Sequence, residues 1–267
     1  MYDNICKVLA EQFSSDFAAW LLGKPTPLTE LSPSELSVEP IRADSLILLE
    51  SEDVVLHIEF QTKPDDNIPF RMADYRLRVY RRFPNKEMYQ FVLYLKETDS
   101  ELVQKTAFEL GKTRHEFNVV RLWEQPTGLF LRSPGLLPFA TLTQTSDRTE
   151  TLRQVAREID TLGDRRQMSN ISASTAILSG LVLNLEVVRR LLRRDIMRES
   201  VFYQEILREG LDEGRQEGRQ EGRQEGRQEE KLATVPRLFK LGLSVEQIAE
   251  ALELNPETVR SLINPSS

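Results

Sequence analysis

Apolar side chains recur at two different spacings along the chain, and these spacings predict its first elements. Residues 3–22 carry apolar side chains at roughly every third or fourth position, which predicts an amphipathic helix. Residues 54–61, VVLHIEFQ, alternate instead between an apolar face and a face that holds polar side chains. Together with the β-prone run 45–50, SLILLE, and the short polar stretch 51–53, they predict a β-hairpin.

The pattern that follows predicts further helices and strands. A helix is expected over 65–83, with Phe70, Ala73, Leu77 and Tyr80 on its apolar side, and strands are expected at 88–95 and 117–123. From Thr149 onward the apolar positions keep helical spacing. The order of elements therefore predicts an α/β core with an α-helical C-terminal half.

Charge and cysteine content narrow the class of protein. A formal net charge of −7 argues against a protein that coats nucleic acids, but it allows an enzyme with a local basic stripe. The single cysteine, Cys6, cannot form an internal disulfide and is expected to be buried, which favours a reducing compartment. Neither a secretion signal nor a bilayer-spanning run is visible, so we expect a cytoplasmic protein with no membrane partner.

The hairpin brings acidic side chains to one face of the sheet. A two-residue turn would pair Glu50 with Asp53 and place Asp44 opposite Glu59. A four-residue loop would pair Glu50 with Val55 and place Asp44 opposite Gln61. Either register puts Asp44 on the face of Glu59 and Gln61, whereas a three-residue loop would not.

Two facing carboxylates repel each other unless a cation lies between them. Mg²⁺, with Mn²⁺ as a substitute, suits a site of this kind because it takes one or two protein carboxylates and completes its shell with water and phosphate oxygens. Asp44 and Glu59 are the candidate metal ligands, and Gln61 is placed to orient a water molecule. Lys63, two residues after Gln61, would point to the same face and add positive charge if the strand extends that far. The alternative is a solvated sheet face with scattered polar residues.

The segment from Pro40 to Phe83, which contains IRADSLILLE and VVLHIEFQTKPDDNIPFRMADYRLRVYRRF, resembles the Rpn family of recombination-promoting nucleases and transposases. This family belongs to the PD-(D/E)XK nuclease superfamily. The resemblance covers most of the first ~150 residues and rests on the R-x-D and E-x-Q arrangements. It implies a mixed sheet flanked by helices, Mg²⁺-dependent DNA cleavage, and a link to recombination or mobile elements.

The same resemblance assigns roles to individual residues. It implies that Asp44 and Glu59 bind the metal and that Gln61 occupies the position where the wider superfamily usually has lysine. A departure of this kind is common in Rpn-like sequences. The superfamily often adds an acid from the first helix, for which Asp3 and Glu11 are both candidates.

The expected helix over 65–83 carries a basic stripe. Arg71, Tyr75, Arg78 and Arg82 lie at helical spacing, so the three arginines are candidates to bind successive DNA phosphates, with Lys63 as a further candidate. The alternative is ion pairing with Glu52, Asp65 or Asp74. The two histidines, His57 and His115, lack the spacing of a zinc site.

The C-terminal part contains a repeat and a small helical tail. The unit Gly-Arg-Gln-Glu recurs from Gly214, and residues 210–230 are interpreted either as a helix that pairs with a second copy of the chain or as a charged linker. A Ser244/Gln247 capping box and the N-cap Asn255 predict short helices that resemble a helix-turn-helix. The expected parts are a nuclease core at 1–165, a helical extension at 166–209, the repeat at 210–230 and the tail at 231–267.

These observations lead to two hypotheses of different class. The first is a Mg²⁺-dependent DNA endonuclease whose catalytic residues are Asp44, Glu59 and Gln61. The second is a non-catalytic DNA-binding or assembly protein on a nuclease scaffold. The complete set of site residues favours the enzyme, whereas the acidic composition and the weakly basic tail favour the second hypothesis.

Overall fold

The computed structural model describes residues 2–31, 46–200, 203–204, 208 and 230–263. The chain divides into two compact units, residues 1–205 and residues 206–267. The Gly-Arg-Gln-Glu repeat and Asp44 lie outside the described residues. No helix in the described part of the chain combines the length and the apolar character needed to cross a membrane.

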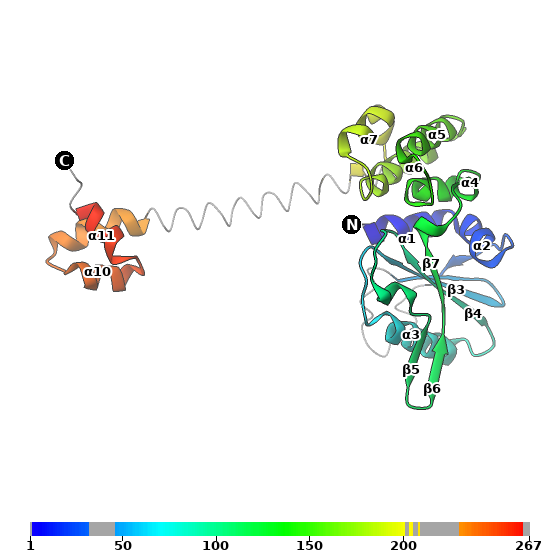
Figure 1. The fold of residues 1–267 in the computed structure, drawn as a ribbon, viewed down its shortest axis with the longest axis horizontal. Helices are drawn as coiled ribbons and strands as arrows, with labels where there is room; N and C mark the ends of the chain where they lie inside the picture. Colours follow the sequence, from blue (N-terminus) through cyan, green and yellow to red (C-terminus); the bar gives the residue numbers. More distant parts are fainter. Residues whose placement is uncertain (1, 32–45, 201–202, 205–207, 209–229, 264–267) are drawn as a thin grey trace. The chain divides into compact units, whose positions relative to one another are not determined.

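A five-stranded mixed sheet forms the centre of the first unit (Figure 1). Its order is β1-β2-β3-β4-β7. Strands β1, β2 and β3 are antiparallel, whereas β4 runs parallel to both β3 and β7. The strands are β1 Thr29–Glu30, β2 Leu46–Glu50, β3 Val54–Gln61, β4 Glu87–Tyr94 and β7 Asn118–Arg121. The α/β class and the mixed sheet are therefore confirmed.

The hairpin of β2 and β3 adopts the wider of the two registers expected from the sequence. Glu50 pairs with Val55, and Leu46 pairs with Glu59. The Ser51 amide donates to the Val54 carbonyl at 2.9 Å and closes the loop. His57, Glu59 and Gln61 consequently share one face of β3.

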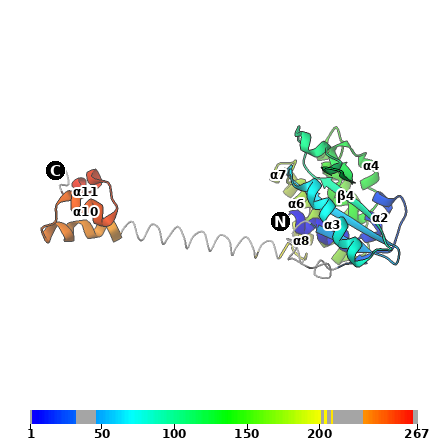
Figure 2. The same cartoon turned by 90° about the horizontal axis from the view of Figure 1, so that it is seen from below.

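Helix α3, Ile68–Arg82, covers the face of the sheet that carries Glu59 (Figures 1 and 2). Its buried side differs from the apolar side expected from the sequence. Phe70, Leu77 and Tyr80 are exposed by 57%, 64% and 59%. The helix instead buries Ile68, Pro69, Met72, Ala73, Tyr75 and Val79. The expected apolar side was wrong because the contact surface of β3 and β4, rather than the apolar count alone, selects the side of α3 that faces inward.

The opposite face of the sheet packs against α1, Tyr2–Gln12, α2, Ser14–Leu22, and the 3-10 helix η4, Pro134–Leu142 (Figure 1). The Phe60 ring stacks on Phe139 at 5.8 Å between centroids and meets the Phe17 ring edge-on at 6.2 Å. All three side chains are buried. This aromatic cluster joins the sheet to the N-terminal helices.

The single helix expected over 3–22 is broken into α1 and α2 at Phe13. The φ and ψ angles of Phe13 are −120° and 39°, outside the helical region. The break brings the Asp16 carboxylate to the Gly135 amide, which donates to it at 2.8 Å. A Cβ at position 135 would lie 2.2 Å from Phe13 Cβ, so this close approach requires glycine. Contact with η4 therefore interrupts the local helical pattern.

Several elements between the sheet and the helical half were not expected from the sequence. The most prominent is the hairpin of β5, Ala107–Leu110, and β6, Thr113–Glu116, which turns at Gly111 with φ +60°. Its Phe108 contacts the Phe70 ring of α3. The others are the short helices η2 Glu101–Gln104, η3 Leu122–Glu124 and α4 Thr127–Phe130, together with η4.

The helical half of the first unit packs on η4. Its helices are α5 Arg148–Asp160, α6 Arg165–Ser179, α7 Leu185–Leu191 and α8 Arg194–Met197. The Thr141 and Ser179 hydroxyls hydrogen-bond at 3.0 Å between η4 and α6. The compact unit that contains the sheet extends to residue 205. It therefore includes nearly all of the helical extension expected at 166–209.

The second unit contains a helix over residues 230–240 followed by α10, Val245–Leu252, and α11, Pro256–Ile263. The expected capping box is present, because the Ser244 hydroxyl accepts from the Gln247 amide at 3.3 Å and the Gln247 side chain accepts from the Ser244 amide at 2.9 Å. Arg260 Nη2, on α11, lies 3.3 Å from Glu246 Oε1. That pairing neutralises a cation that a DNA-docking helix would direct toward phosphate.

We predict that Phe60→Ala destabilises the first unit by about 3–5 kcal/mol, because it opens a cavity between the sheet and α2. Urea unfolding followed by tryptophan fluorescence measures the effect, since the two tryptophans of the chain, Trp20 and Trp123, both belong to the first unit. The exposed Tyr80→Ala serves as the control and is expected to change stability by less than about 0.5 kcal/mol. Equal effects of the two substitutions would contradict the assigned core.

Candidate active site around Glu59

Glu59 carries the most deeply buried carboxylate of the sheet. Its side chain has no exposed surface and lies near the C-terminal end of β3, between the parallel neighbour β4 and the antiparallel neighbour β2. Removing a charged carboxylate from water is costly unless a cation or several donors compensate for the lost hydration. The groups around Glu59 must therefore compensate for its lost hydration, and they define the candidate site.

Among the described residues, α3 and β3 each supply a donor to Glu59. The Arg71 guanidinium, from the first turns of α3, donates to Glu59 Oε1 through Nη2. Gln61 Nε2, two residues along β3, donates to the same oxygen at 3.0 Å. Arg71 Nη1 also lies 3.7 Å from Asp65 Oδ2, and 27% of the Arg71 side chain is exposed. Arg71 thus connects the buried carboxylate with the protein surface.

A second polar group lies beside Glu59 on the same face. His57 is fully buried, and its Nε2 lies 3.7 Å from Glu59 Oε2. Gln90 of β4 lies against its other ring nitrogen, with Gln90 Nε2 3.0 Å from His57 Nδ1 and 2.8 Å from the Met72 carbonyl oxygen of α3. His115 Nε2, on β6, lies 2.7 Å from Gln90 Oε1. The two histidines, 58 positions apart in the sequence, are therefore joined through one glutamine.

The hydrogen bonds of Gln90 select the tautomers of both histidines. An amide NH₂ group can only donate, so His57 Nδ1 accepts from Gln90, and the proton of the neutral ring is on Nε2, facing Glu59. The amide oxygen of Gln90 can only accept, so His115 Nε2 donates to it. Burial, with contributions from Arg76 and His57, lowers the pKa of His115 below its usual value. This favours the neutral form of that histidine.

Two tyrosines border the buried carboxylate. Burial raises the pKa of Tyr75, whose ring meets His57 edge-on at 5.2 Å, and the charge of Glu59 raises it further. Burial is also the main cause of the raised pKa of Tyr94, followed by the charge of Asp65. Both phenols consequently remain protonated and able to donate hydrogen bonds over the physiological range.

The structure brings together only some of the residues expected at the site. Glu59, Gln61 and Arg71 form one cluster, whereas Asp44 lies outside the described residues. Of the other candidates for phosphate binding, Lys63 and Arg82 are exposed, and Arg78 Nε lies 2.8 Å from Asp74 Oδ2. Ion pairing with Asp65 and Asp74 was the alternative interpretation of the arginine stripe, and the structure shows both pairs.

The first helix does not supply an acid near Glu59 within the described part of the structure. Helix α1, which carries Glu11, lies on the opposite side of the sheet from α3 (Figure 1), and Glu11 Oε1 lies 3.7 Å from Lys7 Nζ. Burial and the nearby Glu30 raise the pKa of Glu11. The Asp3 side chain is outside the described residues. In the residues that the structure describes, no three His, Cys, Asp or Glu side chains form a group that could hold a metal ion.

Sequence reasoning did not anticipate the roles of His57, Gln90 and His115. The sequence did contain a signal for His57, because residues two positions apart in a strand point to the same face of the sheet, and His57 precedes Glu59 by two. No sequence signal identified Gln90, whose place opposite His57 depends on the parallel pairing of β3 with β4. His115 reaches the site only through the hairpin that was missed.

Comparison with known proteins gives no relative. No family model matches the chain, and neither a curated protein nor a solved structure matches it. The resemblance to the Rpn family therefore rests on the residues of the sequence itself.

We predict that Gln90→Met destabilises the first unit by at least about 2 kcal/mol, because His57 Nδ1 loses its donor and His115 Nε2 loses its acceptor, and each unsatisfied buried group costs about 1–3 kcal/mol. Urea unfolding followed by tryptophan fluorescence measures the change. Gln104→Met is the matched control, since Gln104 is exposed at the end of η2 and should tolerate the same substitution. A Gln90→Met protein as stable as the control would show that the network contributes nothing to stability.

Proposed function

We propose that this chain is a Mg²⁺-dependent endonuclease that hydrolyses phosphodiester bonds in DNA, and that it acts in recombination or in the movement of mobile elements. The observation that carries the proposal is the fully buried carboxylate of Glu59, which shares a face of β3 with Gln61 and is reached from the surface through Arg71. The link to mobile elements rests on the resemblance of residues 40–83 to the Rpn family.

A contribution to folding stability does not by itself account for a buried carboxylate paired with an arginine. Replacing a buried ion pair with apolar side chains of similar volume is often neutral or stabilising, so an ion pair retained in a core is weak support for a purely structural role. Titratable groups in unusual environments cluster instead at functional sites. Glu59 has this character, and its partner Arg71 is partly exposed, as a group that meets a substrate must be.

The oxygen atoms at the site fit a hard divalent cation. Mg²⁺ binds carboxylate and amide oxygens and uses one or two protein carboxylates when phosphate supplies further ligands. Because Gln61 donates to Glu59 through Nε2, its amide oxygen is directed away from Glu59. We assign Glu59 and Asp44 as the ligands, since the register of the hairpin is the one for which the sequence analysis expects Asp44 opposite Gln61. When bound, Mg²⁺ would polarise the phosphodiester and lower the pKa of an attacking water.

Residues of the chain itself perform the remaining steps. Hydrolysis adds water across one P–O bond and leaves a phosphate monoester end and a hydroxyl end. Gln61, oriented by its hydrogen bond to Glu59, positions the water. Arg71 carries the only guanidinium in contact with Glu59 among the described residues, and its exposed part can donate to a phosphate oxygen.

Exposed cations of the same unit would position the DNA backbone. Lys63 follows Gln61 after the end of β3, and Arg82 closes α3 about 16 Å along the helix axis from Arg71. The separation of Arg82 from Arg71 suits a contact to another phosphate of the same strand rather than to the scissile phosphate, and we assign Lys63 a contact of the same kind. Arg78, paired with Asp74, would have to exchange that partner before it could bind DNA.

We predict that the purified chain nicks supercoiled plasmid in the presence of Mg²⁺ or Mn²⁺ and that EDTA stops the reaction. Asp44→Asn and Glu59→Gln should each lower the rate at least about 100-fold, because each removes the charge that holds the cation and leaves the side-chain volume unchanged. Gel analysis of the nicked and linear products measures the rate.

Glu52→Gln is the matched control for these substitutions, since Glu52 is an exposed acid in the turn of the same hairpin. It should cut at the rate of the unmodified chain. Thermal unfolding of each variant separates loss of activity from loss of fold. Cleavage at the unmodified rate by both Asp44→Asn and Glu59→Gln would remove the nuclease assignment from this site.

The Arg71–Glu59 ion pair supports a second candidate function, a non-catalytic DNA-binding or assembly protein on a nuclease scaffold. A guanidinium already compensates the charge of Glu59, so this carboxylate can be buried without a metal ion. In this case DNA would bind through the same exposed cations, and no metal-dependent cleavage would follow.

We predict for either function that Lys63→Gln and Arg82→Gln each lower the slope of log affinity against log salt by about 0.9, the effect of one phosphate contact. Fluorescence anisotropy with a labelled DNA duplex at several salt concentrations measures the slope. Arg153→Gln on α5 is the control, because its guanidinium already pairs with Glu150. If the slopes of Lys63→Gln and Arg82→Gln equal that of the control, these side chains do not contact DNA.

A further inference from the structure

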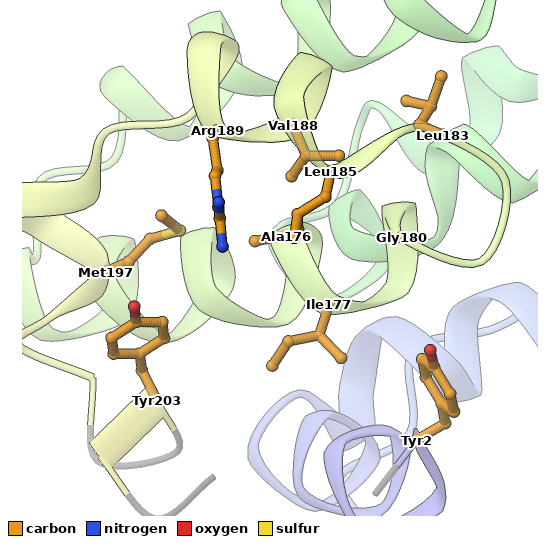
Figure 3. A pocket seen from close by; sticks show the side chains of 10 residues that line it. All are labelled: Tyr2, Ala176, Ile177, Gly180, Leu183, Leu185, Val188, Arg189, Met197 and Tyr203. Carbon is orange, nitrogen blue, oxygen red and sulfur yellow. The ribbon is translucent and has the colours of Figure 1, made fainter. Parts of the chain in front are cut away.

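A cavity of about 400 Å³ lies in the helical half of the first unit, away from Glu59. Figure 3 shows that its walls come from α6, from α7 with the segment before it, and from the first residues of α1. Ligand sites of small molecules usually have volumes of about 300–1,000 Å³. The cavity is thus large enough for a small organic ligand.

Apolar side chains form most of the cavity wall. Aliphatic groups come from α6 and α7 and from the loop and helix that flank α7, namely Ala176, Ile177, Leu183, Leu185, Val188 and Met197. Two tyrosines, Tyr2 and Tyr203, complete the lower side in Figure 3. Such a wall favours a ligand that buries hydrocarbon.

Among the described residues that line the cavity, Arg189 is the only charged one, and it is exposed on α7. Its side chain points from α7 toward the middle of the group of lining residues (Figure 3). The acids of the following segment already have partners, because Asp195 pairs with Arg193 at 2.9 Å and Glu199 pairs with Arg165 at 2.6 Å. Among the described residues, no acidic side chain pairs with Arg189, so its positive charge is available to a ligand.

We propose that this cavity binds a small amphiphilic anion, an unbranched carboxylate with an apolar tail. The tail would occupy the aliphatic part of the cavity, and the carboxylate would accept hydrogen bonds from the Arg189 guanidinium, a geometry that suits a planar carboxylate. A cationic or neutral amphiphile of the same length would gain the apolar contacts but not the charged one. The proposal is independent of the DNA-cleaving function.

Titration calorimetry of the full chain with octanoate, decanoate and dodecanoate, each below the concentration at which it forms micelles, tests the proposal. We expect binding of one molecule per chain. Affinity should rise about fourfold for each added methylene group until the cavity is full, and then stop rising. An unlimited rise with chain length, or the absence of saturable binding for all three, would overturn the proposal.

Two variants test the charged contact. Arg189→Gln should lower decanoate affinity about tenfold and leave binding of decanol unchanged, since only the carboxylate meets the guanidinium. Arg190→Gln is the matched control, because Arg190 is the next residue of α7, is exposed like Arg189, and is not among the residues that line the cavity. Equal losses in the two variants, or tighter binding of decylamine than of decanoate by the unmodified chain, would refute the assigned ligand class.

A third variant tests the location. Ala176→Phe places a ring in the cavity and should lower decanoate affinity more than tenfold while the thermal unfolding temperature stays within a few degrees of the unmodified value. Unchanged affinity would place the ligand elsewhere on the protein and overturn the proposal. If the unmodified chain binds no carboxylate but forms dimers in light scattering that Ala176→Phe abolishes, a second copy of the chain occupies the cavity instead.

Discussion

The Glu59 carboxylate is removed from water in the middle of the sheet, and the side chains that compensate for this removal come from an adjacent helix and from the same strand. Arg71 can reach Glu59 only if α3 lies across β3 with its first turns over the end of that strand. The same placement brings the Tyr75 ring against His57 and the Met72 carbonyl oxygen within hydrogen-bond distance of the Gln90 amide. It leaves Phe70, Leu77 and Tyr80 exposed to solvent. The position of one buried charge is thus coupled to the orientation of a whole helix. The number of apolar residues on each side of α3 does not reveal this requirement, so the pattern alone predicts the wrong buried side.

The polar interior of the first unit is assembled from distant parts of the chain. His57, Gln90 and His115 come from β3, β4 and β6, and they meet because β4 pairs in parallel with β3 while the β5–β6 hairpin lies beside it. The Gln90 amide hydrogen-bonds to one ring nitrogen of each histidine, which selects one tautomer for each of them, whereas His57 Nε2 lies 3.7 Å from Glu59 Oε2, beyond hydrogen-bond distance. A network of this kind confers rigidity where Glu59 and Arg71 meet. Rigid support is what the carboxylate of the proposed active site would require.

Both compact units contain exposed cations as well as cations paired with acids. In the first unit, exposed cations such as Lys63 and Arg82 remain at the surface near the face of Glu59. In the second unit, Arg260 pairs with Glu246 and Lys231 pairs with Glu253 at 2.9 Å. Pairs between exposed side chains contribute little stability, but they reduce the positive potential that DNA binding requires. The DNA contacts that we propose, at Lys63 and Arg82, belong to the first unit, while Arg237 and Lys240 are exposed in the second.

The sequence by itself determined the features that depend on neighbouring residues. Alternation in VVLHIEFQ placed His57, Glu59 and Gln61 on one face, the wider hairpin register was one of two anticipated, and the Ser244/Gln247 capping box was predicted as it is found. Tertiary structure decided the rest. The break of the first helix at Phe13 follows from contact with Gly135, the inward side of α3 follows from its packing on β3 and β4, and Gln90 joins two histidines only through the topology of the sheet. The physical reason is the range of the interactions: hydrogen bonds of turns and caps act over a few residues, whereas compensation of a buried charge depends on whichever part of the chain the fold brings to it.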